Sequence, residues 1–357
     1  MAAVTLDGVS VTRGGTRILD AVSLAVDDGE LFAILGASGS GKTSLLRVVA
    51  GLDTPQNGEL WFDGEAMHGV EPADRDLAMV FQNSSLIPFL SARRNVQFPL
   101  DIRSIAQDEI DKRVLSEMRA LGIEGLTERY PRQLSAGEGQ LVQIARAMVR
   151  RPRVLLLDEP LAMLDAPVRK RLRGDLKRLQ SGYGVTTLFA TNDPEDAMAI
   201  ADRGAVMADG RIAQVGSLQE MYARPATRLV AELLSLAPLT VLRMQVVGDP
   251  GTPHLAARGL VLYPRQVDLD PHIGDEVDVL VRSGDVSVDP VGPISGAVVS
   301  SQRIGSNLLS RVDAGGWTLL MSSRNAPADP GREVTVRISR FHVFAADTGL
   351  SLASTSC

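Results

Sequence analysis

The feature that most constrains this chain is the glycine-rich stretch GASGSGKT at residues 36–43. It follows a continuous apolar run, as in a strand buried on both faces, and precedes a segment with the pattern of a helix. The stretch fits G-x-x-x-x-G-K-[S/T], in which glycines let successive backbone N–H groups turn toward a phosphate chain. We expect Lys42 to reach the β and γ phosphates and Thr43 to offer its hydroxyl to Mg²⁺. The stretch predicts a nucleotide-binding loop, against the alternative of an ordinary turn between a strand and a helix.

A second candidate element is VLLLDEP at residues 154–160, an apolar run that ends in two carboxylates. At the end of a buried strand, Asp158 could hold Mg²⁺ directly or through water. Glu159 is expected to point elsewhere and to polarise an attacking water as a general base. The alternative is a solvated acidic pair at a strand end. The phosphate-binding pattern in the same chain weakens that alternative.

Buried strands alternate with helical segments after the glycine-rich stretch. The strands are expected at 154–158 and 186–191, and the helices at 108–123, 137–150 and 167–180. In the last helix four apolar residues fall on one face: Val168, Leu172, Leu176 and Leu179. This alternation predicts a mainly parallel sheet flanked by helices.

The chain changes character near residue 235. Residues 1–235 begin with alternating, strand-like segments and continue with the strand and helix pattern, whereas residues 236–357 carry short β-branched runs between Gly, Pro and Asp turns. The second part predicts a small all-β barrel or sandwich. A length of 357 residues fits such a division into two or three domains.

Composition excludes several classes of protein. A net charge of -6 argues against nucleic-acid binding, which needs a basic face. The single cysteine, Cys357, rules out a disulfide framework and fits a reducing cytosol. We see no secretory signal and no apolar run near the roughly 18 residues of a membrane helix. A role in a membrane process would therefore be carried out from the water side.

Further motifs give a family resemblance. The stretches are MVFQNSSLIP (79–88), YPRQLSAGEGQLVQIARAMVRRP (130–152), EPLAMLDAPVRKRLR (159–173), and DPEDAMAIADRGAVMADGRIAQVG followed by YARPA (193–226). In this order they resemble the ATP-binding subunits of ABC transporters, and more closely the importer ATPases of the maltose and glycerol-phosphate type. The resemblance is dense over about residues 4–235. The tail resembles the TOBE regulatory domain of those subunits, although VRSGDV stands where an Arg-Pro-Glu run is frequent.

The resemblance implies a fold and binding residues. The fold is an α/β P-loop NTPase (ABC ATPase) core with an antiparallel β subdomain and a helical subdomain at about 86–150, followed by an all-β OB or TOBE-like domain. The cofactors are ATP and Mg²⁺. The ATP ligands implied in the loop are Gly36, Ala37, Ser38, Gly39, Ser40, Gly41, Lys42, Thr43 and Ser44, and the metal ligands are Thr43, Gln82 and Asp158. Gln82 would also sense the attacking water and link the nucleotide site to the transmembrane partner.

The resemblance further implies contacts between two copies of the cassette. The signature segment is Ser135, Ala136, Gly137 and Glu138, and Asp165 matches the loop that crosses between two cassettes. That segment would present a helix N-terminus to the γ-phosphate held by the other subunit, although Ser135 is a good helix cap in any protein. Residues 83–98 would form the groove that receives a coupling helix of a membrane subunit, against the alternative of simple packing within the insert.

The most informative departure from the family is Asn192, which stands at the position of the switch histidine. Asparagine also donates a hydrogen bond, but it is shorter and carries no positive charge. With Asp193, it is also expected to cap the helix that starts at Pro194. We therefore expect Asn192 to slow hydrolysis by weakening contact with the γ-phosphate.

Two other departures concern closure and base binding. Ala136 replaces a glycine where the backbone could need a positive φ, and Glu138 places a carboxylate near a polyanion. Arg13 stands where an aromatic residue stacks on adenine. A guanidinium can also stack on a base, but simple solvent exposure is the alternative. Together these changes predict a Mg-ATP binder with slow hydrolysis.

The function predicted is ATP binding and hydrolysis that energises an ABC importer, for sugars or sugar derivatives. The expected partners are transmembrane permease subunits, a second ATP-binding subunit (the same chain or a related one) and, indirectly, a solute-binding protein. The expected location is the cytoplasmic face of the membrane. Two alternatives remain open: an importer ATPase for an inorganic anion, iron or polyamine, and a weakly hydrolysing regulatory or non-transport ABC ATPase.

Overall fold

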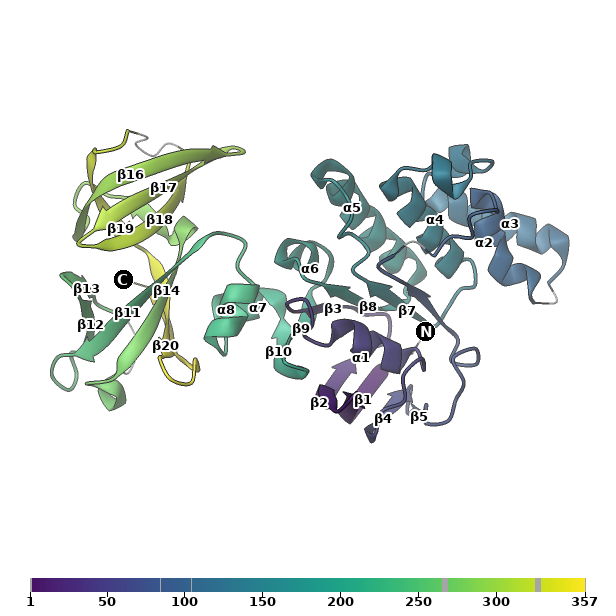
Figure 1. The fold of residues 1–357 in the computed structure, drawn as a ribbon, viewed down its shortest axis with the longest axis horizontal. Helices are drawn as coiled ribbons and strands as arrows, with labels where there is room; N and C mark the ends of the chain where they lie inside the picture. Colours follow the sequence, from purple (N-terminus) through teal and green to yellow (C-terminus); the bar gives the residue numbers. More distant parts are fainter. Residues whose placement is uncertain (1, 84, 104, 265–268, 325–328, 357) are drawn as a thin grey trace. The chain divides into compact units, whose positions relative to one another are not determined.

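The computed structural model describes residues 2–83, 85–103, 105–264, 269–324 and 329–356. The chain divides into two compact units, Met1–Gln219 and Glu220–Cys357 (Figure 1). Cys357, and Ser84 within the predicted groove, lie outside the described residues. In the part of the chain that the structure describes, no helix is both long and apolar enough to span a bilayer.

The first unit is built around a six-stranded sheet with the order β10-β9-β3-β8-β7-β6. Its strands are β3 (Leu31–Leu35), β6 (Leu77–Val80), β7 (Val154–Asp158), β8 (Thr186–Thr191), β9 (Arg203–Ala208) and β10 (Arg211–Ser217). All neighbouring pairs are parallel except β9 and β10. The mainly parallel sheet predicted from the sequence is thus confirmed. Because β3, β7 and β8 are parallel neighbours, the segments that follow them meet at one edge of the sheet.

A second, antiparallel sheet has the order β2-β1-β4-β5. It contains β1 (Val4–Arg13), β2 (Thr16–Val26), β4 (Asn57–Phe62) and β5 (Glu65–Ala66). Helix α1 (Lys42–Val49) shares one apolar core with both sheets, since Leu45 and Leu46 cluster with residues such as Leu6 and Ile34. The antiparallel subdomain therefore anchors the helix that follows the glycine-rich loop.

The helical insert lies between β6 and β7. It contains α2 (Ala92–Asp101), α3 (Gln107–Ala120), the 3-10 turns Glu124–Leu126 and Pro131–Gln133, and α4 (Ala136–Met148). Ile110, Val114 and Met118 of α3 are buried, as their spacing predicts. The insert packs through this apolar face, and its outer face remains exposed.

The remaining helices of this unit are α5 (Ala166–Tyr183), α6 (Pro194–Ile200) and the start of α7 (Leu218–Ala223). In α5, Leu172, Leu176 and Leu179 are buried as predicted. Val168, predicted on the same face, is 36% exposed because it lies in the first turn of α5, where it contacts α4 and not the sheet.

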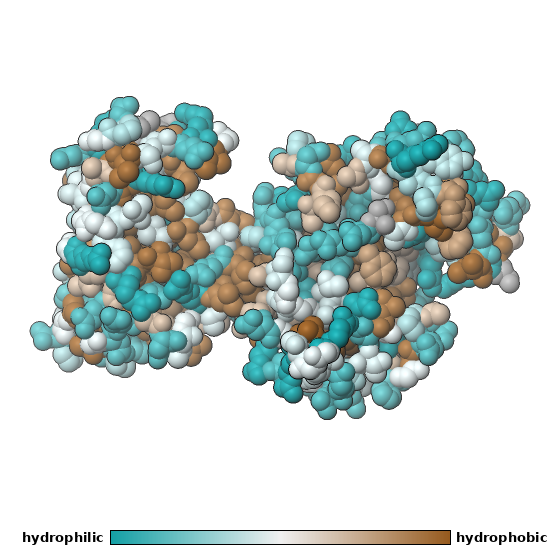
Figure 2. All heavy atoms as spheres, in the orientation of Figure 1, coloured by the Kyte–Doolittle hydropathy of each residue, from teal (hydrophilic) through white to brown (hydrophobic). Residues whose placement is uncertain are grey.

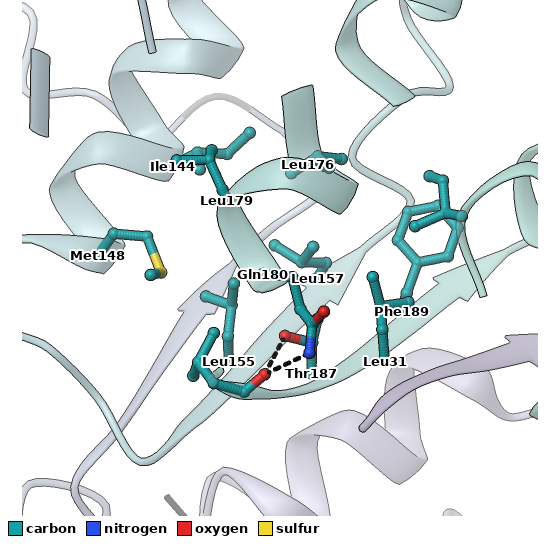
Figure 3. Close-up of a pocket in the computed structure, with 12 residues that line it drawn as sticks. Leu31, Ile144, Met148, Leu155, Leu157, Leu176, Leu179, Gln180, Thr187 and Phe189 are labelled. Carbon is teal, nitrogen blue, oxygen red and sulfur yellow. Dashed lines mark hydrogen bonds between the residues drawn. The ribbon is translucent and has the colours of Figure 1, made fainter. Parts of the chain in front are cut away.

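Figure 3 shows the apolar layer between the central sheet and α4 and α5. Leucine side chains of β7 face Ile144 and Met148 of α4 and leave a cavity of only about 10 Å³. At its edge Val185 accepts hydrogen bonds from Gln180 Nε2 (3.0 Å) and Thr187 Oγ1 (3.1 Å). This dense layer holds β7 and β8 in place, and both strands end at the edge described above.

The second unit is formed by two antiparallel sheets. One contains β11 (Leu239–Val247), β12 (His254–Ala257), β13 (Leu260–Leu262), β14 (Glu276–Arg282), β20 (Arg340–Ala345) and β21 (Ser351–Ser356). The other contains β15 (Val286–Val288), β16 (Ile294–Ile304), β17 (Asn307–Ala314), β18 (Trp317–Ser323) and β19 (Glu333–Ile338). Short 3-10 turns occur at Asp270–His272 and Ser283–Asp285. This architecture confirms the prediction of an all-β domain of TOBE type.

Helix α8 (Arg228–Leu233) packs on this second unit. Ala231 clusters with Leu280 and Phe344, and Arg228 forms a 2.7 Å ion pair with Asp278. The two compact units consequently divide earlier in the chain than residue 235.

Candidate functional site

The glycine-rich loop has a backbone conformation that depends on its glycines. Gly39 and Gly41 have φ of 82° and 105°, a region that side chains with a Cβ rarely adopt. A Cβ at Gly36 would lie 2.5 Å from both the Met207 carbonyl oxygen and Ser40 Oγ. The loop therefore turns tightly at the end of β3 and delivers the chain into α1.

Lys42 is buried beneath this loop. Its Nζ donates to the carbonyl oxygens of Gly36 (2.9 Å) and Ala37 (3.0 Å), and lies 3.5 Å from Glu159 Oε1. A buried ammonium that satisfies its donors on loop carbonyls fixes the loop and holds one positive charge at its centre. That charge is placed where an anionic ligand of the loop would need it.

Thr43 and Asp158 face each other across the edge of the sheet. Thr43 Oγ1 donates to Asp158 Oδ1 at 3.0 Å. Asp158 is only 3% exposed, and this burial raises the pKa of its carboxyl, with the nearby Glu159 carboxylate acting in the same direction and the Thr43 hydrogen bond opposing it. A buried carboxylate that costs free energy to ionise gains most from a bound cation.

Glu159 and Gln82 complete this cluster. Gln82 Nε2 donates to Glu159 Oε2 at 3.2 Å, while the other oxygen of the carboxylate faces Lys42. Glu159 has a φ of 45°, and its N–H donates to the Ala190 carbonyl at 3.0 Å. The strained turn directs Glu159 toward the loop and away from the direction of Asp158.

The donor set at this edge fits Mg²⁺ that also binds a phosphate chain. Magnesium takes hard oxygen ligands and is held by one or two protein groups together with phosphates and water. The Thr43 hydroxyl and the buried Asp158 carboxylate supply two such oxygens. Among the described residues no group of three His, Cys, Asp or Glu could hold a metal by itself. The remaining ligands would come from nucleotide, from water and from the Gln82 side chain that the sequence analysis named.

The signature segment lies at the N-terminus of α4, and Ser135 caps that helix as predicted. Ser135 Oγ accepts from Glu138 N–H at 3.3 Å, and Glu138 Oε2 accepts from Ser135 N–H at 2.8 Å and from its hydroxyl at 3.0 Å. The Ser135 N–H bond is the main reason that the pKa of Glu138 is lowered. The carboxylate thus folds back onto its own helix end, with Arg129 at 3.3 Å, and not outward.

Ala136 does not need the backbone conformation that the sequence analysis considered. It is the first residue of α4 and has no positive φ. Its methyl group is exposed at the helix end. The replacement of glycine therefore leaves the helix start unstrained.

Gly137 is the glycine in this segment that packing requires. It is buried, and a Cβ at this position would lie 2.6 Å from Val168 Cγ1 of α5. Asp165 Oδ1 accepts from Val168 N–H at 3.0 Å and so caps α5. The N-terminal ends of α4 and α5 are thus in direct contact through Gly137 and Val168.

Asn192 and Asp193 were both expected to cap the helix that starts at Pro194, but only Asp193 does so. Asp193 caps α6 alone, because its Oδ1 accepts from Glu195 N–H at 2.8 Å. Asn192 is exposed, and its side chain has no hydrogen bond to any residue that the structure describes. The prediction that Asn192 helps to cap this helix is wrong: its amide remains free at the end of β8.

Arg13 lies at the end of β1 and is ion-paired. Its Nη2 is 2.6 Å from Asp53 Oδ2, and Asp53 also binds Arg47. The side chain is 57% exposed. The guanidinium is thus held by a carboxylate, while much of the side chain is exposed.

The predicted groove at 83–98 carries exposed apolar side chains. Phe89 is 76% exposed, while Leu86, Ile87 and Leu90 are half-buried. Brown, apolar surface appears in Figure 2 over the part of the view that α2 and α3 occupy in Figure 1. A cleft of about 350 Å³ lies nearby, lined by Phe81, Ser85, Pro99 and residues of β6 and α4.

The structure therefore brings five predicted residues into one cluster: Lys42, Thr43, Gln82, Asp158 and Glu159. Between described residues, no hydrogen bond or ion pair links the signature segment to this cluster. Arg169 was missed by the sequence analysis. It binds Asp193 at 2.7 Å and the Ala162 carbonyl at 3.4 Å, and no motif marks an arginine at this place in a helix.

Comparisons with known proteins give close relatives. A family model described as ABC transporter matches residues 19–162. The trehalose/maltose import ATP-binding protein MalK of Thermococcus litoralis is 37% identical over 372 residues, covering 99% of this chain and 100% of that protein. The sn-glycerol-3-phosphate import ATP-binding protein UgpC of Ruegeria pomeroyi is 36% identical over 360 residues, with coverage of 99% and 100%.

A solved structure also matches part of this chain. It is the dimeric, post-hydrolysis state of the ATP-binding cassette MJ0796 bound to ADP and Pi. Its TM-score is 0.55 at 31% identity, and the match covers 60% of this chain and 98% of that chain.

Proposed function

This chain belongs to the ATP-binding proteins of ABC importers, and from this premise we propose that its ATP hydrolysis drives the uptake of a sugar or of a glycerol-phosphate-like solute. It is an ABC-type ATPase with the import-type β-rich domain. The solute class rests on the full-length relatives, whose names give trehalose, maltose and sn-glycerol 3-phosphate. The observation that carries the chemical proposal is the cluster around Lys42, with Thr43, Asp158, Glu159 and Gln82.

In this proposal the loop residues 36–44 cradle the phosphates, and Lys42 moves from loop carbonyls to the β and γ phosphates. Thr43 and Asp158 hold Mg²⁺, which neutralises charge on the phosphates when bound. Glu159 would orient and polarise the attacking water, and Gln82 would help to hold Mg²⁺ and would contact that water. The 3.2 Å contact between Gln82 and Glu159 supports this arrangement, because both groups are already in reach of each other.

We propose that two cassettes act together, as a homodimer or with a related chain. Ser135, Ala136, Gly137 and Glu138 of one cassette would face the γ-phosphate held by the other, with Asp165 crossing the interface. The position of Ser135 at the N-terminus of α4 supports this contact, because the backbone N–H groups at a helix N-terminus favour phosphate. Arg13 would lie beside the base, and its exposed guanidinium would stack on it.

The proposed partners are transmembrane permease subunits at the cytoplasmic face of the membrane, with a solute-binding protein acting through them. The exposed Phe89, and a cleft that Phe81, Ser85 and Pro99 help to line, support the groove at 83–98 as the docking place. We propose an ATPase domain followed by a regulatory domain. The sequence places their boundary at residue 235, whereas the two compact units divide between Gln219 and Glu220.

We also propose that hydrolysis is slow, and we attribute this to Asn192. Ala136 adds no backbone strain, and Glu138 is turned onto its own helix, so neither provides a strong reason. The Asn192 amide has no hydrogen-bond partner among the described residues, which supports its availability for the γ-phosphate. Its side chain is shorter than that of histidine and carries no charge. A missing pre-placed donor costs about 10²–10³ in rate.

Affinity purification of the full chain from its own membranes, followed by reconstitution, tests this function. Permease subunits should co-purify, and ATP hydrolysis by the reconstituted complex should rise with maltose, trehalose or sn-glycerol 3-phosphate. The Glu159→Gln complex provides the matched control for background hydrolysis. Stimulation by an inorganic anion, iron or a polyamine would instead identify another importer. Recovery with a soluble partner alone would favour a regulatory ATPase.

A further inference from the structure

Arg169 joins the two segments that follow strands β7 and β8. It lies in the first turn of α5, where its N–H donates to the Asp165 carbonyl. One guanidinium nitrogen, Nη1, is 2.7 Å from Asp193 Oδ2, and the other, Nη2, donates a long hydrogen bond of 3.4 Å to the Ala162 carbonyl. A single planar group thus spans the turn after β7 and the loop after β8.

Both segments carry a residue with a proposed role at the γ-phosphate. Ala162 N–H donates to the Glu159 carbonyl at 3.3 Å, so the Arg169 contact bears on the turn that begins at Glu159. Asp193 directly follows Asn192, whose side chain has no bond of its own within the described part of the chain. Asn192 consequently depends on its neighbours for its position, and Asp193 is the neighbour that is fixed.

The environment of Arg169 favours a role in geometry over a role in stability. Its side chain is 23% exposed, and its Nε is buried with no hydrogen-bond partner among the described residues. A buried donor without a partner costs free energy, so the position of this arginine does not maximise the stability of the folded chain. Its fork is used instead to reach two acceptors on different segments, which a lysine cannot match with the same fixed geometry.

We propose that Arg169 is a positioning residue for hydrolysis. It sets the spacing between Glu159, which acts on the attacking water, and Asn192, which contacts the γ-phosphate. This inference rests on the role proposed for Asn192. Loss of the tie lets the two segments separate, and a misplacement of about 1 Å can cost roughly 10²-fold in rate. Binding of ATP, which depends on the loop at 36–44, is unaffected.

Arg173 offers a matched control on the same helix. One turn further along α5, it binds Asp196 at 2.6 Å and Glu195 at 2.9 Å, both within α6. Within the described part of the chain, it makes no hydrogen bond or ion pair with the turn after β7 or with Asp193. Removing Arg173 weakens the contact between α5 and α6. It leaves the contacts of the turn after β7 and of Asp193 in place.

The test uses the full chain with Mg-ATP and compares Arg169→Gln, Arg169→Lys and Arg173→Gln. We expect Arg169→Gln to lower kcat about tenfold or more while the Kd for ATP and the Tm stay close to those of Arg173→Gln. Arg169→Lys should recover part of the rate through its charge. Equal kcat in Arg169→Gln and Arg173→Gln overturns the proposal, as does a loss explained by unfolding in both Arg169 variants.

A double-mutant comparison separates the proposal from the role of Asn192. In an Asn192→Ala background, Arg169→Gln should lower kcat by less than about twofold further, because the group it positions is absent. Fully additive losses would contradict the positioning of Asn192 by Arg169. An unchanged kcat in Asn192→Ala alone refutes the role proposed for Asn192, and Arg169 is then judged by its own loss of kcat against Arg173→Gln.

Discussion

The Thr43 hydroxyl donates a 3.0 Å hydrogen bond to Oδ1 of Asp158, although 115 positions separate the two residues in the chain. The bond forms because Thr43 lies in the first turn of the helix that follows β3, and Asp158 is the last residue of β7. Strands β3 and β7 belong to the same mainly parallel sheet. Both residues therefore reach the same sheet edge. The fold thus brings together the oxygens that would bind Mg²⁺.

The first prediction concerns these two oxygens. Thr43→Ala should raise the Mg²⁺ concentration for half-maximal ATP hydrolysis by about tenfold, the factor given by roughly 1.4 kcal/mol of lost binding free energy. Thr43→Ser keeps the hydroxyl and should remain near the wild type. The measurement is a Mg²⁺ titration of hydrolysis at saturating ATP. If Thr43→Ala gives the same Mg²⁺ titration as the wild type, Thr43 is not a ligand of the metal.

The second prediction concerns Asn192. Asn192→His supplies a longer donor that can carry charge, so kcat should rise by about tenfold or more, up to the roughly 10²–10³ that a pre-placed donor can contribute. Asn192→Ala should lower kcat. Steady-state hydrolysis by the assembled complex measures both. If Asn192→His is no faster than the wild type, this position does not limit the rate.

The third prediction concerns the contact between α4 and α5. Gly137→Ala puts a methyl group 2.6 Å from Val168 Cγ1, and overpacking of this kind costs about 1–3 kcal/mol. The Tm of the full chain should fall. The double variant Gly137→Ala, Val168→Ala should recover most of the loss, since the second change removes the clashing methyl. A double variant no more stable than Gly137→Ala would show that Val168 is not the obstacle.

The fourth prediction concerns the pH dependence of stability at Glu117. Burial raises the pKa of this carboxyl, although it accepts a 2.8 Å hydrogen bond from the Tyr183 hydroxyl and lies near Arg151. Burial and the Glu117 carboxylate in turn raise the pKa of Tyr183 to about 12. A raised carboxyl pKa in the folded state means that the protonated form favours folding. Its contribution is complete below the ordinary glutamate value and is lost as pH rises through the folded pKa.

Glu117→Gln should therefore change stability in a pH-dependent way. The glutamine is neutral throughout and can still accept from Tyr183, so its Tm relative to the wild type should be higher at about pH 8 than at about pH 5. Thermal unfolding of both chains at the two pH values measures this difference. The same difference at both values would contradict the assigned titration.

The sequence predicted the site best where a short local pattern dictates the backbone. The glycine-rich loop, the buried strands and the Ser135 cap each follow from neighbouring residues, and the structure contains all three. The cap at Asp193 was harder to predict, because it depends on which of two adjacent residues faces the helix. The exposure of Val168 was also harder to predict, because it depends on contact with a different helix.

Arg169 could not be found in the same way. Its two acceptors lie after different strands, so the contact appears only when β7 and β8 are placed side by side. The orientation of the Glu138 side chain could not be predicted either, because a carboxylate at this position could extend outward or fold back. The hydrogen bond to its own helix end decides between these orientations.

The most direct test of the account is single-turnover ATP hydrolysis by the purified full chain and by its Glu159→Gln variant, with Mg²⁺ present. Nucleotide binding should be unchanged within about twofold, because Glu159 acts on the attacking water and not on the phosphates. Hydrolysis should be abolished in the variant and measurable in the wild type. Hydrolysis by Glu159→Gln at the wild-type rate would contradict the assignment of Glu159, and with it the central claim about this site.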